Sequence, residues 1–333
     1  MQVSDFYYDL PRELIAQEPP AERGASRMLV VSRETQSFRD DWFRNFSRYV
    51  RPGDCLILND TRVFPARLHG RRNHTAGAEV EVLLLRNEES DVWKCLVKPA
   101  KRVRVGDRIL FGEGFSGEVL REGEFGERSI RLIGDTPIDE LLERFGKMPL
   151  PPYIERAPAA ADRDRYQTVF AAHTGSAAAP TAGLHFTPAM LTECEAAGAE
   201  IAYITLHVGL GTFAPLRAKR LEDIQLHEEL FEITKRNAER IQRAKRRFCV
   251  GTTSVRAIES ALTETRGETR LFIRPGYEFQ AADAMLTNFH LPESSLLMLV
   301  SAFAGRELVL AAYRHAVAAQ YRFFSYGDCM LIE

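Results

Sequence analysis

Between about residues 64 and 134 the chain changes its pattern of apolar residues, and this change most constrains the fold. Short segments such as AEVEVLLLR, VWKCLVKPA and ERSIRLI alternate apolar and polar residues and are separated by Gly, Asn or Asp. Such alternation, with turn residues between the segments, predicts antiparallel strands. The amphipathic segment IDELLERFG predicts a short helix, and the prolines of MPLPPYIER indicate a rigid return linker. We therefore predict an inserted antiparallel domain, a β-barrel or a β-sandwich, over residues 63–148.

The flanking residues, 1–62 and 149–333, predict one α/β domain. Loops and short elements lead to the apolar strand CLILND. Thr187 and Pro188 then predict a helix start, Gly198 its end, and IAYITLHVG the next strand. Thr234 predicts the cap of a basic helix that runs through Arg247.

The rest of this domain continues the alternation. The strand FCVG comes before a helix that starts at TTSVR, and LFIRPGYEF, two helices (about 294–304 and AAYRHAVAAQY) and a strand around FFSYGDCMLI follow. The fold class is therefore mixed α/β with a largely parallel sheet, whose ligands bind at the carboxyl ends of the strands. His207, Thr252, Asn288 and Tyr326 lie near such ends.

Composition excludes several classes of protein. The chain has 333 residues, 45% of them hydrophobic, and a net charge of −2, which argues against a binder of nucleic acid over its whole surface. Its longest apolar stretch, about 296–305, is too short for a bilayer, and MQVSDFYYDL does not resemble a signal peptide. We expect a cytoplasmic monomer with no obligate protein partner. Five scattered cysteines without a CxxC pair indicate buried thiols, and neither a disulfide framework nor a zinc site.

Two loops of small residues predict a ligand site. GSAAAPTAGLHFT (175–187) and TLHVGLGTF (205–213) have neither helical nor strand periodicity, and they contain His185 and His207. Small side chains let the backbone approach a ligand, and histidine titrates near neutral pH.

Basic residues are concentrated in three places. The first lies within KCLVKPAKRVR (94–104), the second comprises Arg67, Arg71 and Arg72, and the third lies at 240–247. Each is either a phosphate-binding surface or a solvated face. The common signatures of nucleotide and metal sites are missing: GTTSVR lacks the P-loop lysine, GLGTF does not open a helix, and LHEELFE has a single histidine. We therefore expect neither a metal nor an organic cofactor.

The order of several motifs resembles that of a known enzyme family. NDTRVFPARLHG, LVKPAKR, MPLPPYIER, GSAAAPTAGLHFT, TLHVGLGTF, VGTTSVRAIES, LTNFHLPESSLLMLVSAFAG and YRFFSYGD together resemble the S-adenosylmethionine:tRNA ribosyltransferase-isomerases of queuosine biosynthesis. The resemblance implies an α/β domain with an inserted β-barrel. It also implies transfer and isomerisation of the ribosyl group of S-adenosylmethionine onto 7-aminomethyl-7-deazaguanine at the tRNA wobble position. Adenine and methionine leave, so S-adenosylmethionine is a consumed substrate.

This reaction needs a base for the C5′ proton next to the sulfonium and an acid for the departing adenine. The candidates are His185, His207 and His290; each is alternatively a buried structural histidine. The residues expected to bind the substrates are small, hydroxylated, amide or charged: Asp60, Thr181, Gly183, Gly209, Gly211, Thr212, Thr252, Thr253, Ser254, Arg256, Glu259, Asn288 and Asp328. Among them, the carboxylates are candidates for reading the guanine-like base, and the helix start at TTSVR is a candidate anion site or a simple cap.

The tRNA implied by the resemblance needs a basic and aromatic surface. We predict that four cations contact tRNA phosphates: Arg67, Lys98, Lys101 and Arg102. We also predict that Tyr153 and Tyr166 stack on unpaired bases. Two other classes stay open. A methyltransferase would release S-adenosylhomocysteine, and a non-catalytic RNA-binding protein would not need the two histidine loops.

Overall fold

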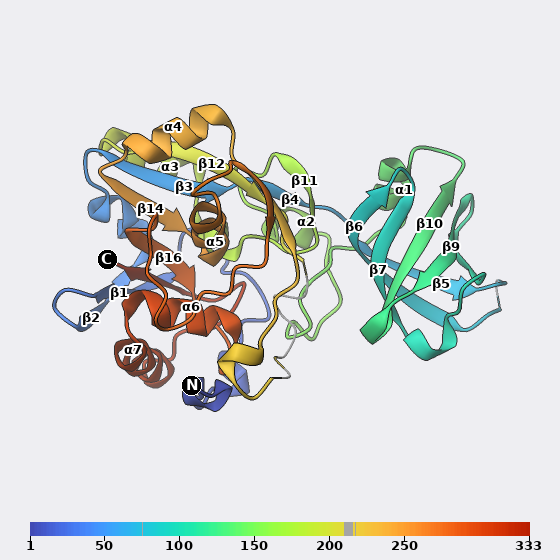
Figure 1. The fold of residues 1–333 in the computed structure, drawn as a ribbon, viewed down its shortest axis with the longest axis horizontal. Helices are drawn as coiled ribbons and strands as arrows, with labels where there is room; N and C mark the ends of the chain where they lie inside the picture. Colours follow the sequence, from blue (N-terminus) through green and yellow to red (C-terminus); the bar gives the residue numbers. More distant parts are fainter. Residues whose placement is uncertain (75, 210–215, 217) are drawn as a thin grey trace.

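An α/β domain and a closed β-barrel lie side by side along the longest axis of the molecule (Figure 1). The computed structural model describes residues 1–74, 76–209, 216 and 218–333. The chain passes from the α/β domain into the barrel after β4 (Thr61–Val63) and returns after α1 (Ile138–Phe145). The predicted fold class, a mixed α/β domain with an inserted antiparallel barrel, is confirmed. The boundaries 63–148 stay a prediction.

A nine-stranded sheet forms the centre of the α/β domain, in the order β15-β13-β12-β3-β14-β16-β17-β1-β2. Its strands are β1 (Arg27–Ser32), β2 (Ser37–Trp42), β3 (Asp54–Asn59), β12 (Glu200–Leu206), β13 (Glu229–Glu232), β14 (Arg246–Val250), β15 (Arg266–Thr269), β16 (Ala284–Asn288) and β17 (Cys329–Ile332). The central strands β12, β3, β14 and β16 are parallel to one another. Their carboxyl ends therefore meet at one edge, where the alternation of strands and helices predicts a ligand site.

Helices and 3-10 turns cover both faces of this sheet. The α-helices are α2 (Asp162–Arg165), α3 (Pro188–Ala196), α4 (Lys235–Arg243), α5 (Thr252–Ser260), α6 (Ser295–Ala304) and α7 (Arg306–Ala318). The 3-10 helices of this domain are η1 (Val3–Phe6), η2 (Arg12–Leu14), η3 (Phe43–Tyr49), η6 (Thr181–His185) and η8 (Leu221–Asp223). Along β3, Cys55 and Ile57 join the core under α5 to α7, while Leu56 and Leu58 join the core under η3 and α3. Burial on both faces explains why CLILND is continuously apolar.

The barrel closes in the order β10-β7-β6-β5-β8-β9, with every pair antiparallel. Its strands are β5 (Arg67–Arg72), β6 (Glu79–Glu89), β7 (Val92–Lys98), β8 (Arg108–Gly112), β9 (Phe115–Glu122) and β10 (Glu127–Gly134), and the short helices η4 (Ala100–Arg102) and η5 (Glu124–Gly126) lie at strand ends. Alternate residues such as Leu68, Val82 and Ile109 fill the interior, and Leu141 and Leu142 of α1 belong to the same core. A separate two-stranded parallel pair joins β4 to β11 (His173–Ser176).

Several local predictions are confirmed. Thr187 caps α3 by accepting a hydrogen bond from Met190 N (3.1 Å), and Gly198 has φ +94° shortly after the helix. Thr234 caps α4, accepting from Asn237 N (3.4 Å). All five cysteines are buried and free.

Other local predictions are wrong. The basic helix ends at Arg243, because Arg246 and Arg247 already belong to β14. The sheet is also less parallel than the alternation indicates, since β1–β2, β12–β13, β13–β15 and β16–β17 are antiparallel. Within the part of the chain that the structure describes, no single helix is long and apolar enough to cross a membrane, although the sharply bent pair α6 and α7 passes that test jointly by length and composition.

Candidate active site

A cavity of about 200 Å³ opens at the carboxyl ends of the central strands. Val208 comes shortly after β12, Gly251 follows β14 and Asn288 ends β16, and all three line the cavity. Its other walls come from residues 179–182, 291–294 and 324–325. Of the predicted binding residues, the structure brings four to this cavity: Thr181, Thr252, Thr253 and Asn288.

The first turn of α5 forms one polar wall. Gly251 has φ +92°, a conformation that favours glycine and lets the chain turn sharply from β14 into the helix. Thr253 Oγ1 accepts a hydrogen bond from Asn59 Nδ2 (3.3 Å), which ties the helix to β3. The backbone N–H groups of a first turn have no partners within the helix, so this wall is suited to an anionic or oxygen-rich ligand. Ser254 instead donates to Val250 O (2.8 Å) and acts as a local brace.

Asn288, which lines the cavity, and His185, which does not, form a buried polar pair. Asn288 Nδ2 donates to Phe324 O (2.9 Å), and His185 Nδ1 shares a hydrogen bond with Ser26 Oγ (2.9 Å). Burial lowers the pKa of His185 to about 4, and the neighbouring Asn288 side chain opposes this shift. Asn288 Oδ1 and His185 Nε2 have no hydrogen bond of good geometry among the described residues. At neutral pH His185 is therefore an uncharged ring whose buried side chain interacts with that of Asn288.

His290 also lines the cavity and is deeply buried. The ring Nε2 of His290 shares a hydrogen bond with Thr287 Oγ1 (2.8 Å). The backbone N–H of His290 donates to the Tyr313 hydroxyl, and its backbone carbonyl accepts from the Tyr8 hydroxyl. Burial lowers its pKa to about 3, so the ring is neutral under ordinary conditions. The bond to Thr287 orients the ring, and the two backbone bonds hold this part of the chain in the wall.

His207 has the most open setting of the three histidines. It is half-buried, its Nδ1 shares a hydrogen bond with Thr61 Oγ1 (2.8 Å), and it stands one residue before Val208 in the cavity wall. A Cβ built on Gly175 would lie 2.7 Å from the His207 ring, so glycine is needed there. Burial, and then the nearby His173, lowers the pKa of His207. The small-residue loop 175–187 thus needs glycine at its first position for a steric reason.

Asp60 lies near this histidine but is not part of the cavity wall. Its Oδ1 accepts a hydrogen bond from Thr205 Oγ1 (2.7 Å), and His173 Nε2 lies 3.6 Å from Oδ2. Burial raises the pKa of Asp60.

Several predicted binding residues have other partners. Arg256 is buried and paired with Glu229. Glu259 accepts hydrogen bonds from the Tyr277 hydroxyl and from the N–H groups of residues 280–282. Asp328 accepts from the N–H groups of Arg27 and Arg322. The structure does not bring these three to the main cavity. Gly183 is also outside it, packed where a Cβ would meet Thr168 and Phe170.

Gly209 lines a second, smaller cavity of about 40 Å³ together with Arg256, His227 and Glu229. Gly211 and Thr212, the remaining predictions from this loop, lie outside the described residues.

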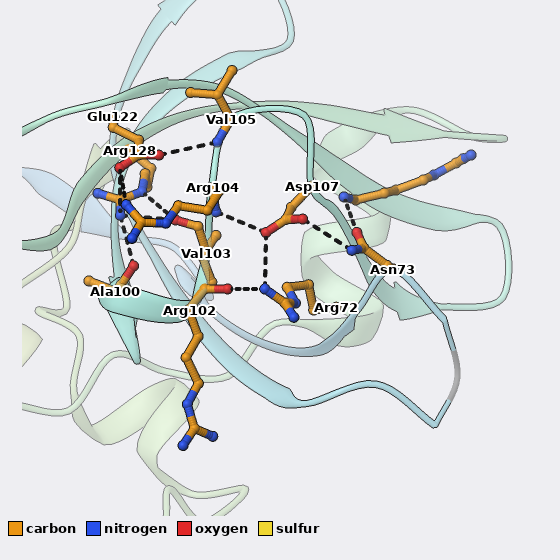
Figure 2. A network of polar contacts seen from close by, with 11 residues as sticks. Arg72, Asn73, Ala100, Arg102, Val103, Arg104, Val105, Asp107, Glu122 and Arg128 are labelled. Atoms are coloured by element: carbon orange, nitrogen blue, oxygen red, sulfur yellow. Dashed lines mark hydrogen bonds and ion pairs between the residues drawn. The ribbon is translucent and has the colours of Figure 1, made fainter.

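The barrel carries the candidate RNA-binding cations. Lys98, Lys101 and Arg102 are exposed, and their side chains form no ion pair or hydrogen bond within the described ranges. Figure 2 shows Arg102 pointing away from a network of polar contacts that holds the loop after β7. In contrast, Arg67 binds Glu81 (2.7 Å) and Leu150 O (3.0 Å), so its guanidinium is largely used within the protein.

Buried Arg128 is the centre of that network. It donates to Ala100 O (2.8 Å) and Val103 O (3.0 Å) and lies 3.5 Å from Glu122, so it fixes the loop to β10. Asp107 accepts from Arg104 N (2.8 Å) and pairs with Arg72 (3.5 Å). The exposed cations are therefore carried on a braced loop.

Tyr153 and Tyr166, the two tyrosines predicted to stack on tRNA bases, lie in different surroundings. Tyr153 lines the main cavity, where its hydroxyl bonds Ser325 Oγ (2.5 Å) and its ring contacts Phe324. The prediction that Tyr166 stacks on a tRNA base is wrong for this conformation, because Tyr166 is fully buried with its ring edge against Tyr326. Apolar packing, which the sequence position does not reveal, uses this ring in the core.

Sequence reasoning missed the wall formed by Phe324, Ser325 and Glu293. Phe324 (φ +72°) and Glu293 (φ +59°) both have left-handed backbone conformations. In the sequence, HLPESS directly follows one predicted strand and FFSYGD lies at another, and these positions were the signal that could have indicated the wall. Among the described residues, no group of three His, Cys, Asp or Glu side chains is placed to hold a metal ion.

Comparison with known proteins agrees with this architecture over the whole chain. A family model described as "Queuosine biosynthesis protein" matches residues 3–332. An S-adenosylmethionine:tRNA ribosyltransferase-isomerase of Solibacter usitatus is 53% identical, and one of Clostridioides difficile is 48% identical, each with full coverage of both chains. The crystal structure of an S-adenosylmethionine tRNA ribosyltransferase from Thermotoga maritima is similar, with a TM-score of 0.57 and 38% identity over 99% of this chain and 100% of that one. The chain belongs to the queuosine biosynthesis family that contains these S-adenosylmethionine:tRNA ribosyltransferase-isomerases.

Proposed function

We propose that this protein transfers and isomerises the ribosyl group of S-adenosylmethionine onto 7-aminomethyl-7-deazaguanine at the wobble position of tRNA. The product is epoxyqueuosine-tRNA, and adenine and methionine are released. The observation that carries this proposal is the cavity at the carboxyl ends of the parallel strands, in a chain that matches the family from residue 3 to residue 332.

The cavity is suited to S-adenosylmethionine. Its hydroxyls from Thr181, Thr252 and Thr253 complement ribose hydroxyls, and the start of α5 complements a carboxylate. Asn288 lines the cavity at the end of β16, and its Nδ2 holds the Phe324 carbonyl in the wall (2.9 Å). Apolar residues such as Val208 and Leu296 complete the walls.

Of the three histidines, His207 is the proposed base for the C5′ proton. Its lowered pKa keeps the ring uncharged at neutral pH, so it can accept a proton, and its partial exposure leaves it within reach of a substrate. Thr61 holds the ring through Nδ1 and leaves Nε2 for the reaction. His185 and His290 are proposed to hold the cavity walls, because both are deeply buried and hydrogen-bonded.

The barrel is proposed to hold the anticodon stem-loop. Lys98, Lys101 and Arg102 supply positive charge that no acid within the described residues neutralises. Phosphate contacts of this kind position an RNA, and the cavity then acts on the base.

Analysis of the products tests the proposal. The purified protein is incubated with S-adenosylmethionine and tRNA that carries the aminomethyl base, and the small molecules are separated. Equal release of adenine and methionine is expected. Release of S-adenosylhomocysteine would instead identify a methyltransferase. Absence of turnover would favour a non-catalytic RNA-binding protein.

We also propose that the protein works as a cytoplasmic monomer without a metal, an organic cofactor or a protein partner. Turnover that is unchanged by a chelator, in a sample of monomeric mass, is the expected result. Loss of activity with the chelator and its return with one metal would overturn the cofactor proposal.

A further inference from the structure

One large aromatic side chain of the barrel, Phe125, is mostly exposed to solvent. Phe125 is 75% exposed, more than the other exposed large hydrophobic residues of the described chain, of which Tyr7 at 61% comes next. Aromatic rings normally contribute most by being buried. Its exposure therefore calls for an explanation other than packing.

The backbone at Phe125 is also unfavourable. Its φ of +53° and ψ of 25° place it in the left-handed region, in the short helix η5 that joins β9 to β10. Bulky residues rarely adopt this conformation, and strain of this kind tends to occur at functional sites. Glycine would fit the position better, and Gly126, with φ +93°, follows directly.

Phe125 lies beside the exposed cations. A Cβ built on Gly126 would be 3.4 Å from Ala100 Cβ, so η5 touches η4, the turn that contains Lys101 and Arg102. Arg128, three residues after Phe125, donates to Ala100 O and Val103 O and fixes this arrangement (Figure 2). The aromatic ring and the cations thus belong to one braced surface.

The acids of this turn are mostly neutralised. Glu127 pairs with Lys94 (3.0 Å) and Glu122 with Arg104 (3.4 Å). Glu124 has no ion pair within the described residues and is the acidic exception. The surface thus combines excess positive charge with one exposed ring, the combination that proteins use to bind single-stranded nucleic acid.

We infer that Phe125 is a stacking platform for an unpaired base of the tRNA anticodon loop, while Lys98, Lys101 and Arg102 contact the adjoining phosphates. This inference rests on the proposed function, since it takes tRNA as the substrate. It adds a contact with the face of a base to contacts with phosphates, and such stacking tolerates any base because every base has a π face.

Salt dependence separates the two kinds of contact. Phe125→Ala should weaken binding of an anticodon stem-loop about tenfold, as expected for one stacked base, without changing the slope of log K against log salt. Phe125→Tyr should keep nearly full affinity. Trp42→Ala removes another exposed aromatic ring, on β2 at the opposite end of the molecule, and is the matched control with unchanged affinity (Figure 1).

Two more readouts separate stacking from a structural role. 2-Aminopurine in the loop of the RNA should be quenched on binding to the wild type and less so on binding to Phe125→Ala. Phe125→Gly should match or exceed the thermal stability of the wild type, because glycine fits the left-handed backbone, while it loses the same affinity as Phe125→Ala.

Unchanged RNA affinity and quenching in Phe125→Ala, with normal turnover, would overturn this inference and leave the proposed function intact. A clear loss of thermal stability in Phe125→Gly would show a structural residue and would also overturn it. If RNA binds normally but Phe125→Ala loses association with another protein, the surface is a protein interface. If the wild type releases neither adenine nor methionine, the proposed function itself fails.

Discussion

The α/β domain and the barrel hold their polar side chains in opposite ways. At the cavity of the α/β domain, Asn288, His185 and His290 are buried and bonded to backbone or hydroxyl groups. On the barrel, Lys98 and Lys101 reach into solvent from a loop that is itself braced. A buried, fixed polar group is suited to orienting a small molecule, whereas an exposed cation is suited to attracting a polyanion.

A basic cluster in the α/β domain sharpens this difference. Arg240 and Arg243 lie against Glu200, and Arg247 pairs with Asp283. Four of the five cations of this third cluster thus lie against acids of the same domain, since Arg246 also pairs with Asp54, whereas Lys245 has no ion pair within the described residues. A count of positive residues does not distinguish it from the barrel loop, but the pattern of ion pairs does.

The largest expected effect comes from His207. His207→Ala should lower kcat by about 10²- to 10⁴-fold, the usual contribution of a general base, with little change in binding of S-adenosylmethionine. Thr61→Val keeps the ring but removes its hydrogen bond, so a smaller fall is expected. Single-turnover release of adenine measures both. If His207→Ala retained the wild-type rate, the base would have to lie elsewhere.

The exposed cations of the barrel should have the next largest effect. Replacing Lys98, Lys101 and Arg102 together with alanine should weaken tRNA binding by at least tenfold and reduce the salt slope by about two, since each phosphate contact in a single strand contributes about 0.7. Affinity for S-adenosylmethionine should not change.

A double variant, Arg240→Ala with Arg243→Ala, is the matched control because these cations are already paired with Glu200. It should bind tRNA almost as well as the wild type. Equal losses in the two variants would mean that tRNA does not discriminate between the surfaces.

The third prediction concerns the pH dependence of stability. Burial lowers the pKa of His185 to about 4 and that of His290 to about 3, from an ordinary value of 6.5. Between pH 6.5 and these values the unfolded chain binds more protons than the folded one, so the free energy of unfolding falls as pH falls. Each group contributes up to about 1.4 kcal/mol per pH unit in that window.

Urea unfolding at pH 7, 6 and 5 measures this dependence. His290→Gln should be less steep than the wild type, because one of the two buried imidazoles is removed. The same slope in both proteins would show that the His290 ring gains a proton in the folded state at an ordinary pH.

The fold follows from local patterns more than the site does. Alternation over 64–134 predicts the antiparallel strands of the insert, and continuous apolar runs such as CLILND predict the central strands. The choice of a closed barrel over a sandwich came from the family resemblance. The antiparallel flanks were not predicted, because β13 and β15 are four-residue strands whose pairing depends on distant partners.

The sequence predicted the position of site residues at strand ends, but not of residues whose partners are distant in the sequence. Strand ends correctly place Thr252 and Asn288 at the cavity, since the topology decides which edge they share. The pairing of Arg256 with Glu229 and the burial of Tyr166 depend on side chains far away in the sequence. No local pattern contains that information.

Binding of S-adenosylmethionine to the Asn288→Ala variant tests the division between the two regions most directly. Titration calorimetry should give a dissociation constant at least tenfold higher than that of the wild type, because Asn288 lines the cavity and its Nδ2 holds the Phe324 carbonyl in the wall (2.9 Å), while affinity for the anticodon stem-loop stays the same. An unchanged dissociation constant for S-adenosylmethionine, in a variant that folds normally, would contradict the claim that this cavity is its site.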